Sequence, residues 1–153
     1  MLQCDFKYQN AAFELNVQFE MNNQIVGIVG PSGSGKSTLF KNIVGLVSPH
    51  QGKIQFNQQI LFDAENKINV AMHQRKIALI FQHASVFPHM NVQQNLKYAS
   101  NLSKHLEQKI SFNQVIDLLE LAPLLKRKAY ELSGGEAQRV SIGRALLSAP
   151  QLL

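Results

Sequence analysis

The stretch Gly30-Pro31-Ser32-Gly33-Ser34-Gly35-Lys36-Ser37-Thr38 decides the fold, because it fits the pattern G-x-x-x-x-G-K-[ST] of a phosphate-binding loop. The glycines of such a loop let backbone N–H groups close around phosphate oxygens. Lys36 is predicted to reach the β- and γ-phosphates of a nucleotide, Ser37 to bind Mg²⁺, and Thr38 to make a weaker phosphate contact. An ordinary glycine-rich turn before a helix is the competing interpretation.

The residues on either side favour the phosphate loop over the turn. Residues 25–29 are apolar on both faces, as a central strand of a covered parallel sheet must be. After the loop, Leu39, Ile43 and Leu46 recur at helical spacing, which predicts a helix over residues 36–46. A loop between a strand and a helix N-terminus is the context that this motif requires.

The remaining patterns predict an α/β chain. Further strands are expected at residues 13–20 (antiparallel, from strict alternation of apolar and polar residues), 54–56, 60–62 and 77–81. The last of these is a second core strand, and it ends in Gln82. Residues 91–121 are mostly helical in pattern, and a final helix is predicted from about residue 134 to Pro150.

Composition excludes several classes of protein. The 153 residues are 45% hydrophobic and 16% charged, which suits one packed domain. No apolar run approaches the roughly 20 residues of a membrane helix, and no signal peptide is recognisable, so the chain is expected in the cytosol. The net charge of +5 is dispersed, so no nucleic-acid partner is predicted. One cysteine and five histidines lack metal-site spacing, and any metal is therefore expected to arrive with nucleotide.

A second motif, Leu132-Ser133-Gly134-Gly135-Glu136-Ala137-Gln138-Arg139, contains the capping box S-x-x-E at the start of a helix. Ser133 and the N–H groups of Gly134 and Gly135 would form a second anion site at that helix N-terminus. A well-capped helix whose glycine pair merely packs closely is the competing interpretation. Two phosphate sites on one short chain favour a dimer.

At these residues the chain resembles the ATP-binding subunit of ABC transporters, whose signature is L-S-G-G-x-x-Q-R. The resemblance covers the whole chain. It implies a P-loop NTPase core with an antiparallel β subdomain and a helical subdomain at about 91–135, in one nucleotide-binding domain over 1–153 that is incomplete at its C-terminus. It also implies ATP and Mg²⁺ as ligands and head-to-tail pairing with a second copy. Ser133 and Gly135, in a signature that runs to Glu136, would then contact the γ-phosphate held by the partner's Lys36.

The same resemblance assigns residues outside the two loops. Gln82 matches the family's glutamine that touches Mg²⁺ and the attacking water, although a polar strand end is the competing interpretation. Residues 83–96 resemble the part of importer ATPases that receives the membrane permease, where an exposed Phe87 would be an interface residue. An aromatic residue near the N-terminus usually stacks on adenine in this family, and Tyr8 is favoured over Phe6 for that role.

Within the importers, the chain looks most similar to the molybdate importer ATPase. The compact opening Met1-Leu2-Gln3, the stretch Phe87-Pro88-His89 and residues 133–150 carry this likeness. It implies ATP-driven import of an oxyanion by a peripheral subunit on the cytoplasmic face of the inner membrane. Importers of sulfate, iron or polyamines and a soluble, non-transport ABC protein remain alternatives. A small P-loop kinase would leave residues 132–139 unexplained.

The family's hydrolytic residues have no counterpart in these 153 residues. Leu152-Leu153 matches the start of the strand that in the family ends in Asp-Glu, so the Walker B aspartate, the catalytic glutamate, the D-loop and the switch histidine are not found. A positioned general base is worth about 10² to 10⁴ in rate. We therefore expect very slow hydrolysis, poor solubility from exposed apolar sheet edges, and a chain that is a fragment of a longer ATPase.

Overall fold

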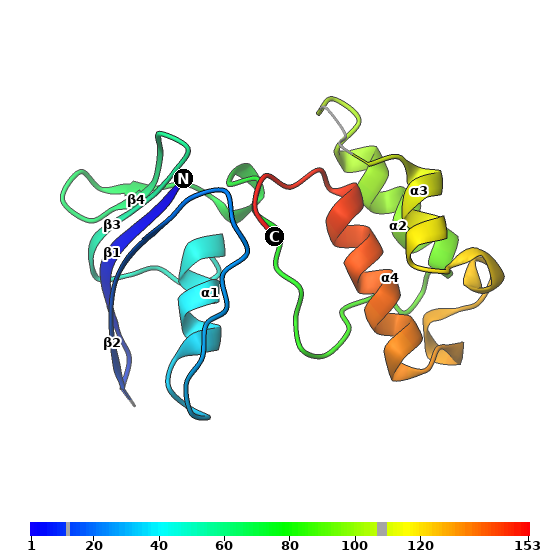
Figure 1. The fold of residues 1–153 in the computed structure, drawn as a ribbon, viewed down its shortest axis with the longest axis horizontal. Helices are drawn as coiled ribbons and strands as arrows, with labels where there is room; N and C mark the ends of the chain where they lie inside the picture. Colours follow the sequence, from blue (N-terminus) through cyan, green and yellow to red (C-terminus); the bar gives the residue numbers. More distant parts are fainter. Residues whose placement is uncertain (12, 107–109) are drawn as a thin grey trace. The chain divides into compact units, whose positions relative to one another are not determined.

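The structure is a computed structural model that describes residues 1–11, 13–106 and 110–153 (Figure 1). The chain divides into two compact units, residues 1–75 and residues 76–153. The first unit holds the phosphate-loop sequence, and the second holds both Gln82 and the signature sequence. Each unit is described by itself.

The first unit is built on an antiparallel sheet in the order β2-β1-β3-β4-β5. The strands are β1 (Leu2–Gln9), β2 (Glu14–Met21), β3 (Gln51–Phe56), β4 (Gln59–Asp63) and β5 (Ile68–Asn69). Alternation sets the buried face, since Val17 is buried and its neighbours Asn16 and Gln18 are exposed. The predicted antiparallel strand at 13–20 and the short strands at 54–56 and 60–62 are confirmed.

Helix α1 (Lys36–Val44) follows the phosphate loop in the first unit, and a buried arginine covers its C-terminal end. The helix ends at Gly45, which adopts φ = 85° and donates its N–H to the carbonyls of Lys41 and Asn42. Arg75, after the short 3₁₀ helix η1 (Met72–Gln74), donates from one guanidinium nitrogen to the carbonyls of Asn42 (2.9 Å) and Ile43 (2.8 Å). A cation at this end also complements the helix dipole.

Two predicted core strands are wrong in this structure. Residues 25–29 form no strand, and Ile25 and Val29 are 104% and 94% exposed. Residues 77–81 form none either, apart from one parallel bridge between Ile77 and Leu152. A strand exists only where a neighbouring backbone accepts and donates its hydrogen bonds, and within the described residues no strand lies beside 25–29. The apolar pattern therefore indicates that a segment is suited to a sheet, but it does not show that the segment is part of one.

The second unit is helical and has a core of its own. Its elements are α2 (Val92–Leu102), α3 (Phe112–Leu118), η2 (Ala122–Leu124), η3 (Ala129–Glu131) and α4 (Gly134–Leu147). The core consists of Val92, Leu96, Ala99, Val115, Leu121, Leu124, Val140 and Leu147. The helices predicted within 91–121 and from residue 134 are confirmed, although α4 ends before Pro150. No helix in the described parts has the length and apolarity to cross a membrane.

Replacing Gly45 with alanine is expected to lower the free energy of unfolding by about 2 kcal/mol or more. An alanine must adopt the left-handed conformation, and its Cβ would lie 2.6 Å from Nε of Arg75. Urea unfolding followed by circular dichroism measures the change. The control is Gly27→Ala, where no atom lies within 4 Å of the added carbon and an effect within about 0.5 kcal/mol is expected. Equal stability of the two variants would contradict this account of the helix end.

Candidate nucleotide-binding site

The phosphate loop takes a shape that only glycine allows at two points. Gly33 and Gly35 have φ values of 81° and 89°, in the left-handed region that other residues avoid. A Cβ on Gly35 would also lie 3.1 Å from side-chain atoms of Phe13 and Leu15. The loop passes directly into α1, with Gly35 as the residue that precedes its first turn.

The N-terminus of α1 differs from those of α2, α3 and α4. Each of these three helices closes its first turn with a reciprocal capping box, formed by Asn91 and Gln94, by Ser111 and Gln114, and by Ser133 and Glu136. At α1 no side chain caps the helix, and no acidic residue lies in its first turn. The backbone N–H groups there remain available, at the positive end of the helix dipole, for an anion.

The predicted lysine of the loop is held over its own backbone. Nζ of Lys36 donates to the carbonyls of Gly30 (2.8 Å) and Pro31 (2.7 Å), and it lies 3.4 Å from Oγ of Ser34. Ser37 is exposed at the start of α1. The ammonium group, the hydroxyl and the uncapped helix end therefore belong to one short segment. This arrangement offers positive charge and hydrogen-bond donors to phosphate oxygens.

Only one of the two aromatic candidates is available to a base. Phe6 is 1% exposed and belongs to the core of the first unit. Tyr8 is partly exposed, and its ring lies 6.3 Å from the ring of Phe13 and 5.8 Å from that of His50. Tyr8 thus remains the candidate for stacking on adenine.

The signature sequence forms the N-terminus of α4. The N–H of Glu136 donates to Oγ of Ser133 (3.3 Å), and the N–H of Ser133 donates to the Glu136 carboxylate (2.7 Å). Gly134 and Gly135 are exposed, and no described atom lies within 4 Å of the Cβ position of either. Packing within the described residues thus gives no reason for this glycine pair, which weakens the interpretation of a merely close-packed helix.

The electrostatics of this helix end favour an ionised Glu136. Hydrogen bonds from Ser133 are the main cause that lowers the pKa of the Glu136 carboxyl, and the charges of Arg127 and Arg139 lower it further. Arg127 also forms an ion pair with this carboxylate at 3.4 Å. The carboxylate is thus committed to closing the helix N-terminus.

Gln82 is exposed in the segment that leads to α2. Nε2 of Gln138 donates to the carbonyl of the preceding residue, Phe81 (3.2 Å). Phe87 is partly buried, unlike the exposed interface residue expected, because its ring lies 4.9 Å from the ring of Tyr98 and 4.0 Å from the guanidinium carbon of Arg144. Nothing in the sequence pattern singled out Arg144 beyond its place as an arginine in an otherwise apolar part of α4.

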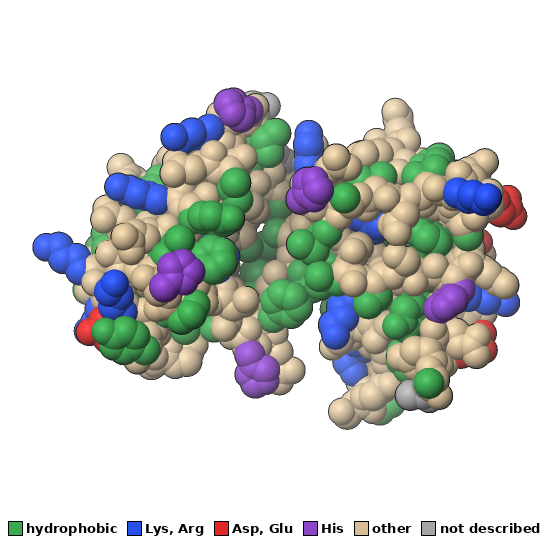
Figure 2. Space-filling model, turned by 180° about the vertical axis from the view of Figure 1, so that it is seen from behind, with side chains coloured by type: hydrophobic (Ala, Val, Ile, Leu, Met, Phe, Trp, Pro, Cys, Tyr) green, Lys and Arg blue, Asp and Glu red, His purple; other side chains and the backbone are tan. Residues whose placement is uncertain are grey.

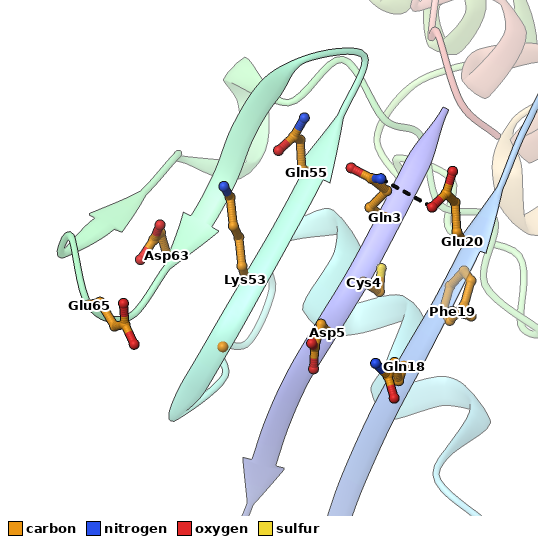
Figure 3. Close-up of a pocket in the computed structure, with 11 residues that line it drawn as sticks. Gln3, Cys4, Asp5, Gln18, Phe19, Glu20, Lys53, Gln55, Asp63 and Glu65 are labelled. Carbon is orange, nitrogen blue, oxygen red and sulfur yellow. Dashed lines mark hydrogen bonds between the residues drawn. The ribbon is translucent and has the colours of Figure 1, made fainter.

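Two other features of the surface do not form a site. A shallow hollow of about 630 Å³ lies on the polar face of the sheet (Figure 3), where Gln3 donates to Glu20 (3.1 Å) beside Lys53 and Asp63. None of the predicted site residues lines it. In each of the two units, Lys and Arg side chains lie scattered over the surface that Figure 2 draws.

The described residues contain no cluster of three or more His, Cys, Asp or Glu side chains that could hold a metal ion. The oxygen donors that the sequence assigns to Mg²⁺ are a hydroxyl, in Ser37, and an amide, in Gln82. Mg²⁺ prefers oxygen ligands and is usually bound by few protein groups together with substrate phosphates. Each of these two side chains, taken by itself, offers an oxygen donor of the kind that suits an ion brought by a nucleotide.

A phosphate loop before an uncapped helix, an antiparallel sheet and a signature-bearing helix define a nucleotide-binding cassette. Residues 14–153 match the family model described as ABC transporter. The chain therefore belongs to the ABC transporter family.

The individual relatives agree with this assignment. The chain is 42% identical over 152 residues to the Molybdenum import ATP-binding protein ModC of Mesorhizobium japonicum. This alignment covers 99% of this chain and 41% of that protein. It is 44% identical over 150 residues to the protein of the same name from Vibrio parahaemolyticus, covering 96% of this chain and 40% of the relative. The chain thus spans about two fifths of the length of the curated relatives that it matches.

Solved structures show the same fold. The ATP-binding cassette MJ0796, solved as a dimer in a post-hydrolysis state with ADP and Pi bound, matches with a TM-score of 0.73 and 25% identity. The match covers 98% of this chain and 71% of that one. The predicted class, a P-loop NTPase of the ABC ATPase type with antiparallel and helical parts, is confirmed.

Replacing Glu136 with glutamine tests the capping charge. Because folding lowers the pKa of this carboxyl, its stabilisation is present above the ordinary value of about 4.3 and is lost as pH falls through the folded-state pKa. Glu136→Gln is expected to be less stable than wild type at pH 7, with the difference shrinking below about pH 4. Urea unfolding from pH 3 to 7 measures this, with exposed Glu120→Gln as the control. Parallel curves for wild type and Glu136→Gln would contradict the assignment.

Proposed function

We propose that the chain is the nucleotide-binding part of an ABC ATPase subunit that couples ATP binding and hydrolysis to the import of molybdate. The observation that carries this proposal is the phosphate loop, where α1 alone among the four α-helices described has no capping side chain. The names of the relatives support the transported anion, since both proteins described above are molybdenum importer subunits. Sulfate, iron or polyamine import is the alternative for the substrate.

The nucleotide site is proposed residue by residue. Residues 30–38 hold the phosphates, with Lys36 on the β- and γ-oxygens, and Tyr8 stacks on adenine. The hydroxyl of Ser37 and the amide oxygen of Gln82 bind Mg²⁺. When bound, this ion neutralises charge on the phosphate oxygens. Support comes from the uncapped helix end, from the donors of Lys36, and from the ADP and Pi in the MJ0796 cassette.

A second copy of the chain is the proposed partner at the signature. Ser133, Gly134, Gly135 and Glu136 of one copy would face the ATP held by Lys36 of the other. The open space at both glycines supports this, because a surface without side chains lets a phosphate approach the backbone N–H groups. The dimeric state of the MJ0796 cassette supports it further. Residues 1–153 are proposed to belong to one nucleotide-binding domain, with its helical subdomain at about 91–135.

Membrane permease subunits are the proposed second partner, docked at residues 83–96. The ATPase would then be a peripheral protein on the cytoplasmic face of the inner membrane. Hydrolysis is proposed for the complete ATPase, because the matched relatives extend well beyond the matched region. The experiment is uptake of labelled molybdate into vesicles that hold the complete ATPase and its permease. ATP-driven uptake of sulfate without molybdate would overturn the substrate, and failure to associate with any permease would overturn the transport role.

Lys36→Ala is expected to weaken ATP binding by roughly 10- to 100-fold, because hydrogen bonds to charged groups contribute about 1.5–3 kcal/mol. Equilibrium binding of a fluorescent ATP analogue in the presence of Mg²⁺ measures this. Lys41→Ala is the matched control, because Lys41 is exposed on the same helix and its substitution removes the same charge. If both variants bind ATP equally well, Lys36 does not hold the phosphates.

Tyr8→Ala is expected to weaken ATP binding roughly tenfold while leaving inorganic triphosphate binding unchanged, because only ATP carries a base to stack. Competition of both ligands against the same fluorescent analogue separates the two affinities. Tyr130→Ala, at a tyrosine that is 80% exposed in the second unit, is the control. An equal loss for ATP and triphosphate would show that Tyr8 acts on the loop and not on adenine.

A further inference from the structure

Helix α4 holds the segment around Gln82 from one side. At the start of the segment, the side chain of Gln138 donates to the carbonyl of Phe81 (3.2 Å), the residue before Gln82. Further along the helix, the guanidinium of Arg144 donates to the carbonyl of Ser85, three residues after Gln82. Gln138 and Arg144 are six residues apart, which is about 9 Å along a helix. Two hydrogen bonds from one helix therefore hold the chain on both sides of residues 82–84.

The segment around the contact of Arg144 with Ser85 is itself held in place by other residues. Phe87 lies under the guanidinium of Arg144, with 4.0 Å between the guanidinium carbon and the ring centroid, a cation–π geometry. The rings of Phe87 and Tyr98 of α2 lie nearly perpendicular to each other, at an interplanar angle of 77°. Asn95, which is 1% exposed, accepts from the N–H of Phe87 (2.8 Å) and donates to its carbonyl (3.2 Å). Arg144 thus contacts a segment that residues of α2 also hold in place.

Arg144 is placed there at a cost. It forms no ion pair with a carboxylate in the described part of the chain, and its Nε is buried there without a hydrogen-bond partner. Burial lowers the pKa of this arginine. Arg144 is only partly buried, but even partial removal of a cation from water without a counter-ion is unfavourable. The contacts to Ser85 and Phe87 are what the arginine gains.

We propose that Gln138 and Arg144 are positioning residues, which fix Gln82 relative to the helix whose first residues are the signature. The inference rests on the proposed function for the roles of Gln82 and of Ser133. A nucleotide that contacts the N-terminus of α4 would then move or immobilise the Gln82 segment through the body of the helix. In the opposite direction, a permease that displaces residues 83–96 would move α4, and with it the signature at the start of that helix.

A spin label beside Gln82 tests the link. His83 is exposed, so His83→Cys gives a labelling site next to an intact Gln82. The native Cys4 does not compete, because burial raises its pKa to about 12 and only a thiolate reacts. Asn113→Cys, exposed on α3, carries the same label as a reference position in the second unit.

Without nucleotide, Gln138→Glu and Arg144→Ala are each expected to raise the ratio of mobile to immobile label at position 83 about fivefold. Gln138→Glu keeps the side-chain shape but cannot donate to a carbonyl. Arg144→Lys should give an intermediate value, because an ammonium group does not reproduce the stacked, planar guanidinium. Lys126→Ala, exposed in the same unit, should have no effect. Unchanged label mobility at position 83 would overturn the proposal. An equal increase in label mobility at position 113 would overturn it too, because such an increase indicates general unfolding.

Addition of MgATP separates this inference from the proposed function. Wild-type chain is expected to bind MgATP and to immobilise the label at position 83 further. In Arg144→Ala the ATP affinity should stay within about twofold while this immobilisation is lost, a split that general damage to the fold does not produce. Immobilisation that persists in Arg144→Ala overturns the link. Absence of ATP binding in the wild-type chain refutes the proposed function, and the mobility comparison without nucleotide still decides whether Gln138 and Arg144 hold the segment.

Discussion

The buried guanidinium of Arg75 is the contact on which the first unit depends. It is 1% exposed, and it donates to the carbonyls of Asn42, Ile43 and Val70 and to the side chain of Asn69. Burial lowers the pKa of this group, and burying it is tolerable because each of its three nitrogens donates a hydrogen bond. These bonds join the end of α1 to the residues that follow β4. The orientation of α1, and with it the phosphate loop at the opposite end of the helix, is therefore set from its C-terminus.

The N-termini of the helices divide the molecule into closed and open positions. Helices α2, α3 and α4 each satisfy their first turn with side chains of their own, whereas α1 does not. Free N–H groups at an uncapped helix end forgo about 1 kcal/mol of capping stabilisation. At α4 the cap is closed, but the two glycines leave the approach to the backbone open. A capped helix that is still accessible suits transient contact with a partner's phosphate, while the open end of α1 suits a ligand that stays.

Local chemistry made much of this predictable from the sequence. The alternation at residues 13–20 and the capping box at Ser133 depend on neighbouring residues, and both appear in the structure. The strands expected at 25–29 and 77–81 depend on a distant partner strand, and an apolar run carries no information on whether that partner is present. Arg75 and Arg144 were beyond prediction for the same reason. Most of their hydrogen-bond partners are backbone carbonyls, which leave no mark on the sequence pattern.

The lysine of the loop shows how the site could select a nucleotide. The ammonium group of Lys36 is bonded to two neutral carbonyls, those of Gly30 and Pro31. A phosphate bound as proposed would replace these neutral carbonyl acceptors of Lys36 by anionic oxygens. Hydrogen bonds to such charged acceptors are about twice as strong. Only the difference between the two sets of bonds contributes to affinity. In the proposed role of Lys36, the loop carbonyls would therefore hold the ammonium group in place and reduce its net attraction to weakly charged ligands, which would favour a triphosphate over a single anion.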